Sequence, residues 1–531
     1  MNWLNRVALR PSYLAREYNR SDARQRASLP IPSFLSAAEQ ALREAVLAAP
    51  DADKVRLVYA DWLEHNGAPE RAEFIRVQIA RARSRDDDER DRLEERQEIL
   101  LRQHGRSWLA ELEPWAPADC RFRRGFVAEL TLTGRAFVSR CAGLFETAPV
   151  RRVRLIAVTP FLADVARVPQ LARLAALDLA DNQVGDDGLR ELLASEWLQL
   201  TELCLRRNKL SQAGVARLSD CRHLDSLACL DLSDNPLGPG AVLAVTRAAA
   251  FPALDQFDCN RAGVGLAGVQ ALARSAVIAS WRHLGLAGNS ITPEATRSLS
   301  ASPYPGSLAS LTLAHNPIGP AGVGFLCAAR ALSAVRSLDL GFAGLGDEGA
   351  RLLTGWPGLA AVEELGLAGN RIGELGARAL ASATNADKLR RLDLTANALG
   401  DTGAVSLLRT GRLANLRHLV LTNNRLSDLC VPSLMAAPRL GELRSLSLAW
   451  NRIGDAGARG LAGCPALARL RSLDLSGNDI GVSGAQALAA SPYLGGLRRL
   501  GLAENPRLWG PAVAQLRERF GDALQIVPER R

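Results

Sequence analysis

The sequence predicts an α/β solenoid in which strand–helix repeats stack side by side, preceded by a small all-helical region. A cassette rich in leucine and ending in asparagine recurs along most of the 531 residues, as in LDLSDN at 230–235 and LDLTAN at 392–397. After one interval of 26 residues, every interval between the asparagine slots is 27. A fixed period of this length indicates a repeat architecture, which more often provides a binding surface than an enzyme active site.

The asparagine slot of each repeat is expected to hold the repeats together. Eleven of the thirteen slots contain Asn, and Ala262 and Ala343 are the exceptions. A carboxamide can donate to and accept from backbone groups of neighbouring repeats, which would otherwise be buried unpaired at a cost of roughly 1–3 kcal/mol each. We therefore predict a structural asparagine ladder in which the two alanines are weak positions. The ladder consists of Asn182, Asn208, Asn235, Asn289, Asn316, Asn370, Asn397, Asn424, Asn451, Asn478 and Asn505.

The order of elements within a repeat can be read from residues 389–408, LRRLDLTANALGDTGAVSLL. Leu392 and Leu394 alternate with polar residues, which predicts a short strand with one buried face. Asp401 then precedes apolar residues at helical spacing, Leu407 among them, and we expect it to cap the helix of its own repeat. Asp186, Asp347 and Asp455 lie at the same phase. Each repeat is thus a strand, an asparagine turn and a helix of about two to three turns.

Stacking of such repeats predicts a curved solenoid. Neighbouring strands lie about 4.8 Å apart but neighbouring helices need about 8–10 Å, so the helical side is longer. The pattern LxxLxLxxNxLGDxGAxxLA resembles the ribonuclease-inhibitor-like class of leucine-rich repeats over roughly residues 150–531. The resemblance implies a horseshoe with a parallel concave sheet and convex helices. It implies no ribonuclease inhibition, because a fold does not fix a function.

The residues before the repeats follow another pattern, with helices expected at 36–49, 54–66, 69–82 and 86–104. The run AAPDADKVRLVYADWLEHNGAPERAEFIRVQ resembles the repeat-companion domain that precedes leucine-rich repeats in many planctomycete proteins. That resemblance implies a helical cap and a bacterial, planctomycete origin, but no activity. We expect four regions: a basic, disordered arm at 1–35, the helical domain at 36–115, a transition with degenerate first repeats at 116–160, and the solenoid with its C-terminal cap at 161–531.

The composition and motifs favour a protein without catalytic residues, metal or cofactor. The six histidines are scattered without HExxH spacing, and the sequence has no GxxxxGK[ST] or GxSxG motif. The nine cysteines form no CxxC pair, which favours a reducing, cytoplasmic location. No apolar run reaches the roughly 18 residues of a membrane span, and the N-terminus does not resemble a signal peptide.

Candidate binding residues lie on and beside the predicted concave face. Seven residues before the slot, arginine occupies five consecutive repeats, and like charges about 5 Å apart repel unless anions intervene. This arginine column comprises Arg390, Arg417, Arg444, Arg471 and Arg498, and Arg391 lies beside it. Four residues before the slot lie Asp231, Asp258, Asp339, Asp393 and Asp474. Large aromatic residues are rare on this face, with Phe342 and Trp450 as the exceptions.

These features predict a monomeric, cytoplasmic, non-enzymatic scaffold that binds an unidentified protein partner and no membrane. One alternative is a GTPase-activating-type regulator of a small GTPase, because such activators share this class of repeats. Another is a nucleic-acid binder, less favoured, whose affinity would fall steeply with salt. The arginine column has a structural interpretation as well, namely a solvated rim in an arginine-rich protein: the net charge is +9 and only three lysines occur.

Overall fold

The computed structural model describes residues 36–526 except 111, 113–116, 118, 248–249, 305, 410–412, 414 and 437–439. The basic arm expected at 1–35 lies outside the described residues. The chain forms two compact units, which are treated separately below. Unit 1 comprises Met1–Asn235 and Ala249–Leu254, and unit 2 comprises Pro236–Ala248 and Asp255–Arg531.

Unit 1 begins with the four helices that the sequence predicts: α3 (Ala37–Ala48), α4 (Asp53–His65), α5 (Pro69–Arg83) and α6 (Asp87–Leu109). Ser36 caps α3, because its side chain accepts a hydrogen bond from the Glu39 amide at 3.1 Å. Asp86 caps α6 in the same way through the Glu89 amide at 2.9 Å. The N-terminal helical region is therefore confirmed, and its last helix runs to Leu109 rather than to residue 104.

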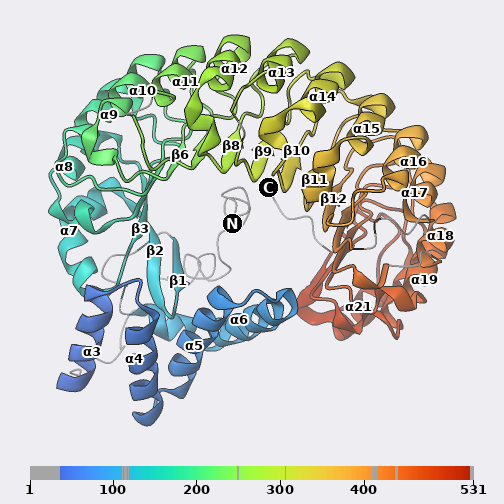
Figure 1. The fold of residues 1–531 in the computed structure, drawn as a ribbon. Helices are drawn as coiled ribbons and strands as arrows, with labels where there is room; N and C mark the ends of the chain where they lie inside the picture. Colours follow the sequence, from blue (N-terminus) through green and yellow to red (C-terminus); the bar gives the residue numbers. More distant parts are fainter. Residues whose placement is uncertain are drawn as a thin grey trace. The chain divides into compact units, whose positions relative to one another are not determined.

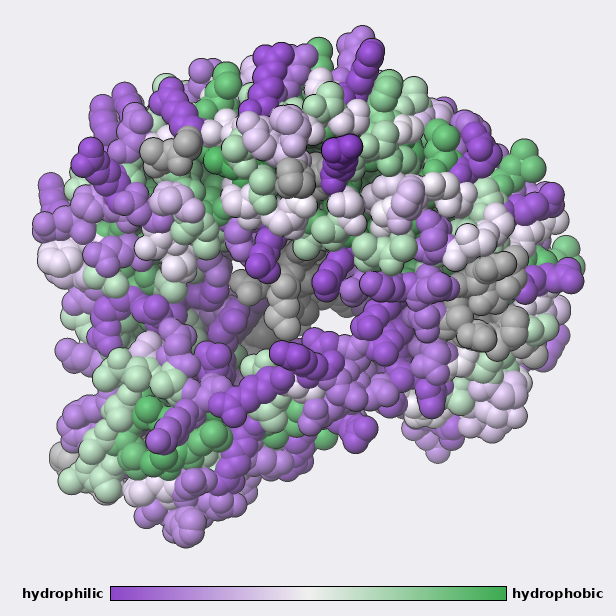
Figure 2. Space-filling model, viewed as in Figure 1, coloured by the Kyte–Doolittle hydropathy of each residue, from purple (hydrophilic) through white to green (hydrophobic). Residues whose placement is uncertain are grey.

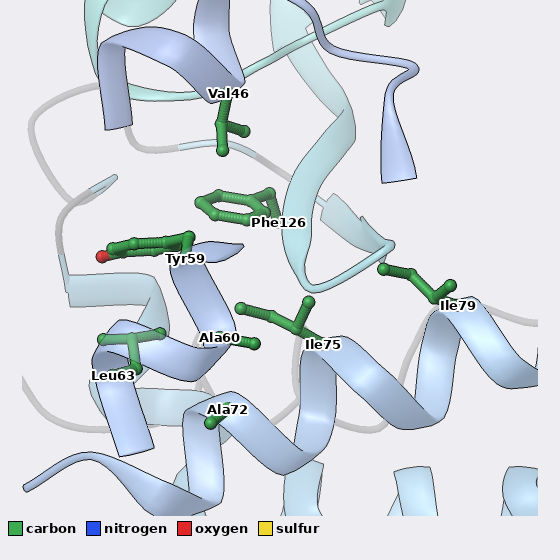
Figure 3. Packing of buried hydrophobic residues seen from close by; sticks show 8 residues of the cluster. All are labelled: Val46, Tyr59, Ala60, Leu63, Ala72, Ile75, Ile79 and Phe126. Carbon is green, nitrogen blue, oxygen red and sulfur yellow. The ribbon is translucent and has the colours of Figure 1, made fainter. Parts of the chain in front are cut away.

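The helices pack against the first hairpin of unit 1, which consists of β1 (Asp119–Arg123) and β2 (Phe126–Thr133). Figure 3 shows Phe126 of β2 among buried side chains of α3, α4 and α5. Arg56 of α4 is only 2% exposed and donates to the carbonyls of Pro50 and Arg124 at 2.5 and 3.0 Å. Burial lowers the pKa of Arg56 to about 10. The cluster in Figure 3 consists of Val46, Tyr59, Ala60, Leu63, Ala72, Ile75, Ile79 and Phe126.

Beyond the hairpin, unit 1 continues as parallel strands with helices on their outer side (Figure 1). The strands pair in chain order from β2 to β6. They are β3 (Arg152–Ile156), β4 (Ala176–Asp178), β5 (Glu202–Cys204) and β6 (Cys229–Asp231). The helices are α7 (Gly134–Thr147), α8 (Leu162–Ala166), α9 (Gly185–Leu193) and α10 (Gln212–Ser219).

Unit 2 repeats this arrangement with strands inside and helices outside an arc (Figure 1), and its strands pair in parallel from β7 to β17. The strands are β7 (Gln256–Asp258), β8 (His283–Gly285), β9 (Ser310–Thr312), β10 (Ser337–Asp339), β11 (Glu364–Gly366), β12 (Arg391–Asp393), β13 (His418–Val420), β14 (Ser445–Ser447), β15 (Ser472–Asp474), β16 (Arg499–Gly501) and β17 (Leu524–Gln525). The helices are α11 (Pro239–Val245), α12 (Gly265–Arg274), α13 (Pro293–Ser300), α14 (Gly319–Ala328), α15 (Gly346–Thr354), α16 (Glu374–Ser382), α17 (Gly400–Arg409), α18 (Val431–Met435), α19 (Asp455–Ala462), α20 (Val482–Ala489) and α21 (Pro511–Phe520). The predicted fold class, an α/β leucine-rich repeat solenoid, is confirmed.

Each slot asparagine bonds two consecutive repeats. The Oδ1 atom of Asn397 accepts from the amides of Asn370 and Ile372 in the preceding repeat, at 3.0 and 2.9 Å. Its Nδ2 atom donates to the carbonyls of Leu367 and Leu394, both at 2.9 Å. One buried side chain thereby pairs four backbone groups that the repeat interior removes from water.

At Ala343 the acceptor half of this arrangement is absent. The methyl side chain offers no oxygen to the preceding repeat, and the Ile318 amide donates instead to the Asn316 carbonyl at 2.8 Å. The next slot restores the pattern, because Asn370 Oδ1 accepts from the amides of Ala343 and Leu345 at 2.9 and 3.2 Å.

The expectation that Asp401 caps its own helix is wrong. Asp401 lies within α17, and its carboxylate accepts from the amide and hydroxyl of Ser427 in the following repeat, at 2.7 and 2.6 Å. Asp347 likewise accepts from the amides of Gly373 and Gly376 at the start of α16, at 2.7 and 2.9 Å. The acid therefore caps the helix of the next repeat. The N-termini of neighbouring helices lie side by side, and the side chain of the acid extends from the first turn of its own helix toward the next one.

Where the acid also accepts from the amide inside the following helix, as Asp347 and Asp455 do, that residue is glycine. A Cβ atom on Gly376 would lie 2.5 Å from Asp347 Oδ1 and 2.6 Å from Ile372 Cγ2. On Gly484 it would lie 2.7 Å from Asp455 Oδ1, whose carboxylate accepts from the Gly484 amide at 2.8 Å. The glycine of the Gly-Ala pair in the repeat pattern thus leaves space for a carboxylate of the preceding repeat.

We predict that Ala343→Asn raises the free energy of unfolding by about 1 kcal/mol, because the new carboxamide oxygen would accept from the Asn316 and Ile318 amides. Urea unfolding followed by circular dichroism measures the change. Asn370→Ala, which removes an existing carboxamide one repeat later, is the reciprocal control and should destabilise. A lower stability of Ala343→Asn would show that this slot is shaped for alanine.

We predict that Gly376→Ala destabilises the protein by about 1–3 kcal/mol, because the added methyl group displaces the capping carboxylate and Ile372. Gly324→Ala is the matched control, since a Cβ atom there meets only Leu352 Cδ1 at 3.9 Å. Alanine at this position of α14 should be neutral or stabilising by up to about 1 kcal/mol. Equal thermal midpoints for the two variants would contradict the steric explanation.

Candidate functional site: the concave surface and the arginine column

The strand side of unit 2 is polar and built mostly from small residues. Figure 2 shows hydrophilic side chains gathered along this side, whereas paler residues are frequent over the helices. The half-buried positions of β14, for example, are Ser445 and Ser447, and those of β15 are Ser472 and Asp474. A surface of this kind allows a partner backbone to approach closely but offers few large anchors.

The aspartates four residues before the slot have a structural role in each turn. The Oδ1 atoms of Asp339, Asp393 and Asp474 accept from the backbone amide two residues further on, at 2.9, 2.8 and 3.0 Å. These Asx turns end the strands. Burial raises the pKa of Asp339 above its ordinary value, although the Gly341 amide and the Thr312 hydroxyl oppose this effect.

Asp231 and Asp258 are each only 3% exposed, which corrects the expectation that they present carboxylates on the concave surface. Asp231 accepts from the Ser233 amide at 2.8 Å. Asp258 Oδ1 lies 3.0 Å from Nε2 of His283 in the next repeat. Their neighbours cover them, so neither residue offers its carboxylate to a partner.

Large concave residues are each followed by glycine in the next repeat. Trp450 is 58% exposed, and a Cβ atom on Gly477 would lie 2.6 Å from its Cδ2 atom. Phe342, 49% exposed, lies against Gly369 in the same way. The other face of Phe342 stacks on His315, with ring centroids 4.5 Å apart. The two aromatic side chains are therefore held in place and present partly exposed rings at the C-terminal ends of the strands.

The arginine column lies at the N-terminal ends of the strands. The amides of Arg417, Arg444, Arg471 and Arg498 each donate to the carbonyl of the arginine one repeat earlier, and all four distances are 2.8 Å. Arg390 and Arg471 are exposed, and the other three are partly buried. Arg391 is exposed on β12 beside the column. The five backbones are thus in direct register on adjacent strands.

A hollow of about 640 Å³ lies beside the N-terminal half of the column. Its basic lining residues are Arg336, Lys388, Arg390 and Arg417, and its acidic ones are Glu363, Asp387 and Glu442. Arg336 and Glu363 approach to 3.7 Å. The sequence analysis missed the contributions of Lys388 and Asn415, which come from the loops before β12 and β13 rather than from the strands.

The concave face of unit 1 carries charges of alternating sign. Arg152 pairs with Glu202 two repeats away, and although burial opposes it, this hydrogen bond and the negative charge raise the pKa of Arg152. Arg206 lies 2.6 Å from Asp234, and Arg207 lies 2.9 Å from Asp181. All of these residues except Asp234 line a hollow of about 710 Å³. This network is not visible in the sequence, because its partners are distant in the chain.

The described residues add no metal-binding arrangement to this picture. Among them, no group of three or more His, Cys, Asp or Glu could hold a metal ion. All nine cysteines are free thiols, and burial raises the pKa of Cys120 and Cys430 to about 12. No helix in the described part of the chain is long and apolar enough to cross a membrane.

Comparison with known proteins agrees with the repeat architecture. Residues 174–193, 333–353, 387–408, 443–462 and 469–489 match the family described as Leucine Rich repeat, so the chain contains leucine-rich repeats. No curated protein matches the sequence. One similar solved structure is an internalin from Listeria monocytogenes, with 16% identity, a TM-score of 0.35, and coverage of 68% of this chain and 84% of that chain. Another is the Rad7 and Elc1 complex in yeast, with 16% identity, a TM-score of 0.44, and coverage of 65% and 84%.

We predict that Asp339→Asn raises the free energy of unfolding at neutral pH. Because the folded-state pKa of Asp339 lies above its ordinary value, its carboxylate form costs stability above that value, and the cost disappears as pH falls through the folded-state pKa. The amide retains the acceptor for Gly341. Urea unfolding should therefore show a gain at neutral pH that shrinks near about pH 4.

Asp474→Asn is the control for this change, because Asp474 accepts from the Ser476 amide in the same turn geometry. A stability difference between Asp339→Asn and the wild type that is the same at both pH values would rule out a titration effect at Asp339.

Proposed function

We propose that this chain is a non-enzymatic protein-binding scaffold that captures a negatively charged partner segment along the arginine column. The observation that carries the proposal is the direct register of five arginines on adjacent strands, connected by backbone hydrogen bonds of 2.8 Å. The proposal includes a cytoplasmic, monomeric protein of the ribonuclease-inhibitor-like repeat class with a repeat-companion domain at its N-terminus.

The electrostatics of the column support an anionic partner. The backbones of neighbouring arginines lie about 4.8 Å apart, and like charges on adjacent repeats repel each other. A partner carrying carboxylates or phosphates would replace this repulsion by attraction. Arginine also presents a planar fork of donors that fits such groups in pairs. A charged strip of this kind accelerates association as well as stabilising the complex.

The concave surface beside the column supports a protein partner with polar contacts. Its small side chains provide a shallow floor, and Trp450 at the opposite strand ends is the type of residue that anchors interfaces. Asp393 and Asp474 contribute carboxylate Oδ2 atoms along this floor, while their Oδ1 atoms are bonded within their own turns.

A nucleic acid is the second candidate partner, and the arginine column favours it as well. Phosphate binding releases counterions, so the affinity would fall steeply and linearly on a logarithmic salt scale. Stacked bases would need exposed aromatic platforms. Phe342 does not offer one, because His315 and Gly369 cover the two faces of its ring. Of the two exposed aromatic residues on the concave face, only Trp450 is then left for stacking, and one ring does not provide the series of platforms that successive bases use. We therefore rank the nucleic acid below an acidic protein segment.

We predict that the triple variant Arg417→Glu, Arg444→Glu, Arg471→Glu captures at least about 10-fold less of the principal partner from native cytosol than the wild type. Capture is quantified by mass spectrometry at low and high salt. The control variant Arg274→Glu, Arg330→Glu, Arg409→Glu makes the same change in net charge at exposed positions outside the strands. If both variants lose the same amount of captured partner, the effect comes from net charge and not from the column. Unchanged capture by the first variant would overturn the proposal.

A further inference from the structure

We infer that the partner segment held by the arginine column is an acidic α-helix that lies across the strands, with one carboxylate per helical turn facing one arginine per repeat. This inference rests on the proposed function and specifies the conformation and charge pattern of the partner. The juxtaposition that carries it is the unbroken series Arg390, Arg417, Arg444, Arg471 and Arg498 at one position of five consecutive repeats.

The spacing of the column fits a helix. Strands lie about 4.8 Å apart, so the five arginine backbones span about 19 Å. Residues i, i+4, i+7, i+11 and i+14 share one face of an α-helix, and at 1.5 Å per residue they span about 21 Å. In an extended chain, side chains on one face recur every 6.7 Å or so, and five of them span about 27 Å. The spacing of the carboxylates on a helical partner therefore matches the spacing of the arginine backbones, whereas the spacing on an extended partner is too long.

The shape beside the column allows a helix to settle against it. The neighbouring strand positions, six residues before the slot, are half-buried His418, Ser445 and Ser472 in the middle of the series. Exposed Arg391 and Arg499 occupy the same position at its two ends. The side chains in the middle of this row therefore protrude less than those at its two ends, and the two end residues carry further positive charge. The hollow beside Arg390 and Arg417 continues this low region toward the loops.

Acidic groups set the limits of the strip and the orientation of the partner. Asp393 and Asp474 end the strands that Arg390 and Arg471 precede, three residues further toward the centre of the concave face. Their negative charge disfavours movement of an acidic helix onto the sheet. Glu363 occupies the column position one repeat before Arg390 and ends the positive series. The partner helix should consequently be about four turns long, acidic on one face and free of acidic residues on the opposite face.

Three fluorescently labelled peptides of matched charge test the inference with the full-length protein. The first is an alanine- and glutamine-rich helix with glutamates at i, i+4, i+7, i+11 and i+14. The second has the same composition with the glutamates distributed around all faces of the helix. The third is the first peptide with two central alanines replaced by proline, which breaks the helix. Fluorescence anisotropy at low ionic strength measures each dissociation constant, and a single-stranded oligonucleotide is measured in parallel.

We expect the first peptide to bind at least about 10-fold more tightly than the other two, equivalent to about 1.4 kcal/mol. We also expect Arg417→Glu, Arg444→Glu, Arg471→Glu to abolish this preference, and Arg274→Glu, Arg330→Glu, Arg409→Glu to keep it. Equal binding of all three peptides, lost only in the first variant, would overturn the helix while leaving an anionic docking strip. No peptide binding, or oligonucleotide binding alone through the same arginines, would overturn the inference. The proposed function has its own test: it is overturned if the variant Arg417→Glu, Arg444→Glu, Arg471→Glu captures as much partner from cytosol as the wild type.

Discussion

In eleven of the thirteen repeats, one carboxamide pairs buried backbone groups of its own repeat and of the preceding one, and the exposed surface is arranged by this constraint. Asn397 accepts from two amides of the preceding repeat and donates to carbonyls of the preceding repeat and its own. A repeat that gained or lost a residue between strand and slot would break these bonds. The phase of every other side chain is therefore fixed relative to the slot. An arginine seven residues before the slot consequently falls directly beside the arginine of the next repeat.

Much of the fold follows from local sequence, because the signals for strand, turn and helix all lie within one 27-residue period. Leu392 and Leu394 define the strand and Asn397 the turn, and the structure places them there. Asp401 shows where local reasoning ends. Its type and phase indicate a helix start, but the start that it caps belongs to Ser427, one repeat further on. A single repeat does not reveal which of two adjacent helix ends an acid will reach.

The sequence predicts which residues of the candidate site recur at the same position of successive repeats, but not which side chains contact one another. The arginine column and Trp450 can be located by counting from the slot. The burial of Asp258 depends on its contact with His283, and the pairing of Arg152 with Glu202 joins residues 50 positions apart. Such contacts depend on side-chain lengths and directions across the sheet. They produce two different charged surfaces, compensated internally in unit 1 and dominated by one sign along the column of unit 2.

The alternation of large and small residues along the concave face makes neighbouring repeats unequal. Trp450 needs Gly477 beside it, Phe342 needs Gly369, and carboxylates such as Asp339 occupy the space above Gly366. Removal of the single repeat 452–478 would bring Trp450 against Glu504 instead of a glycine. Although the period is 27 residues, a deletion here avoids such a collision only when each large residue that remains keeps the glycine that follows it. The length of the solenoid can therefore change here by one repeat or by two, provided that no large residue is left without its glycine.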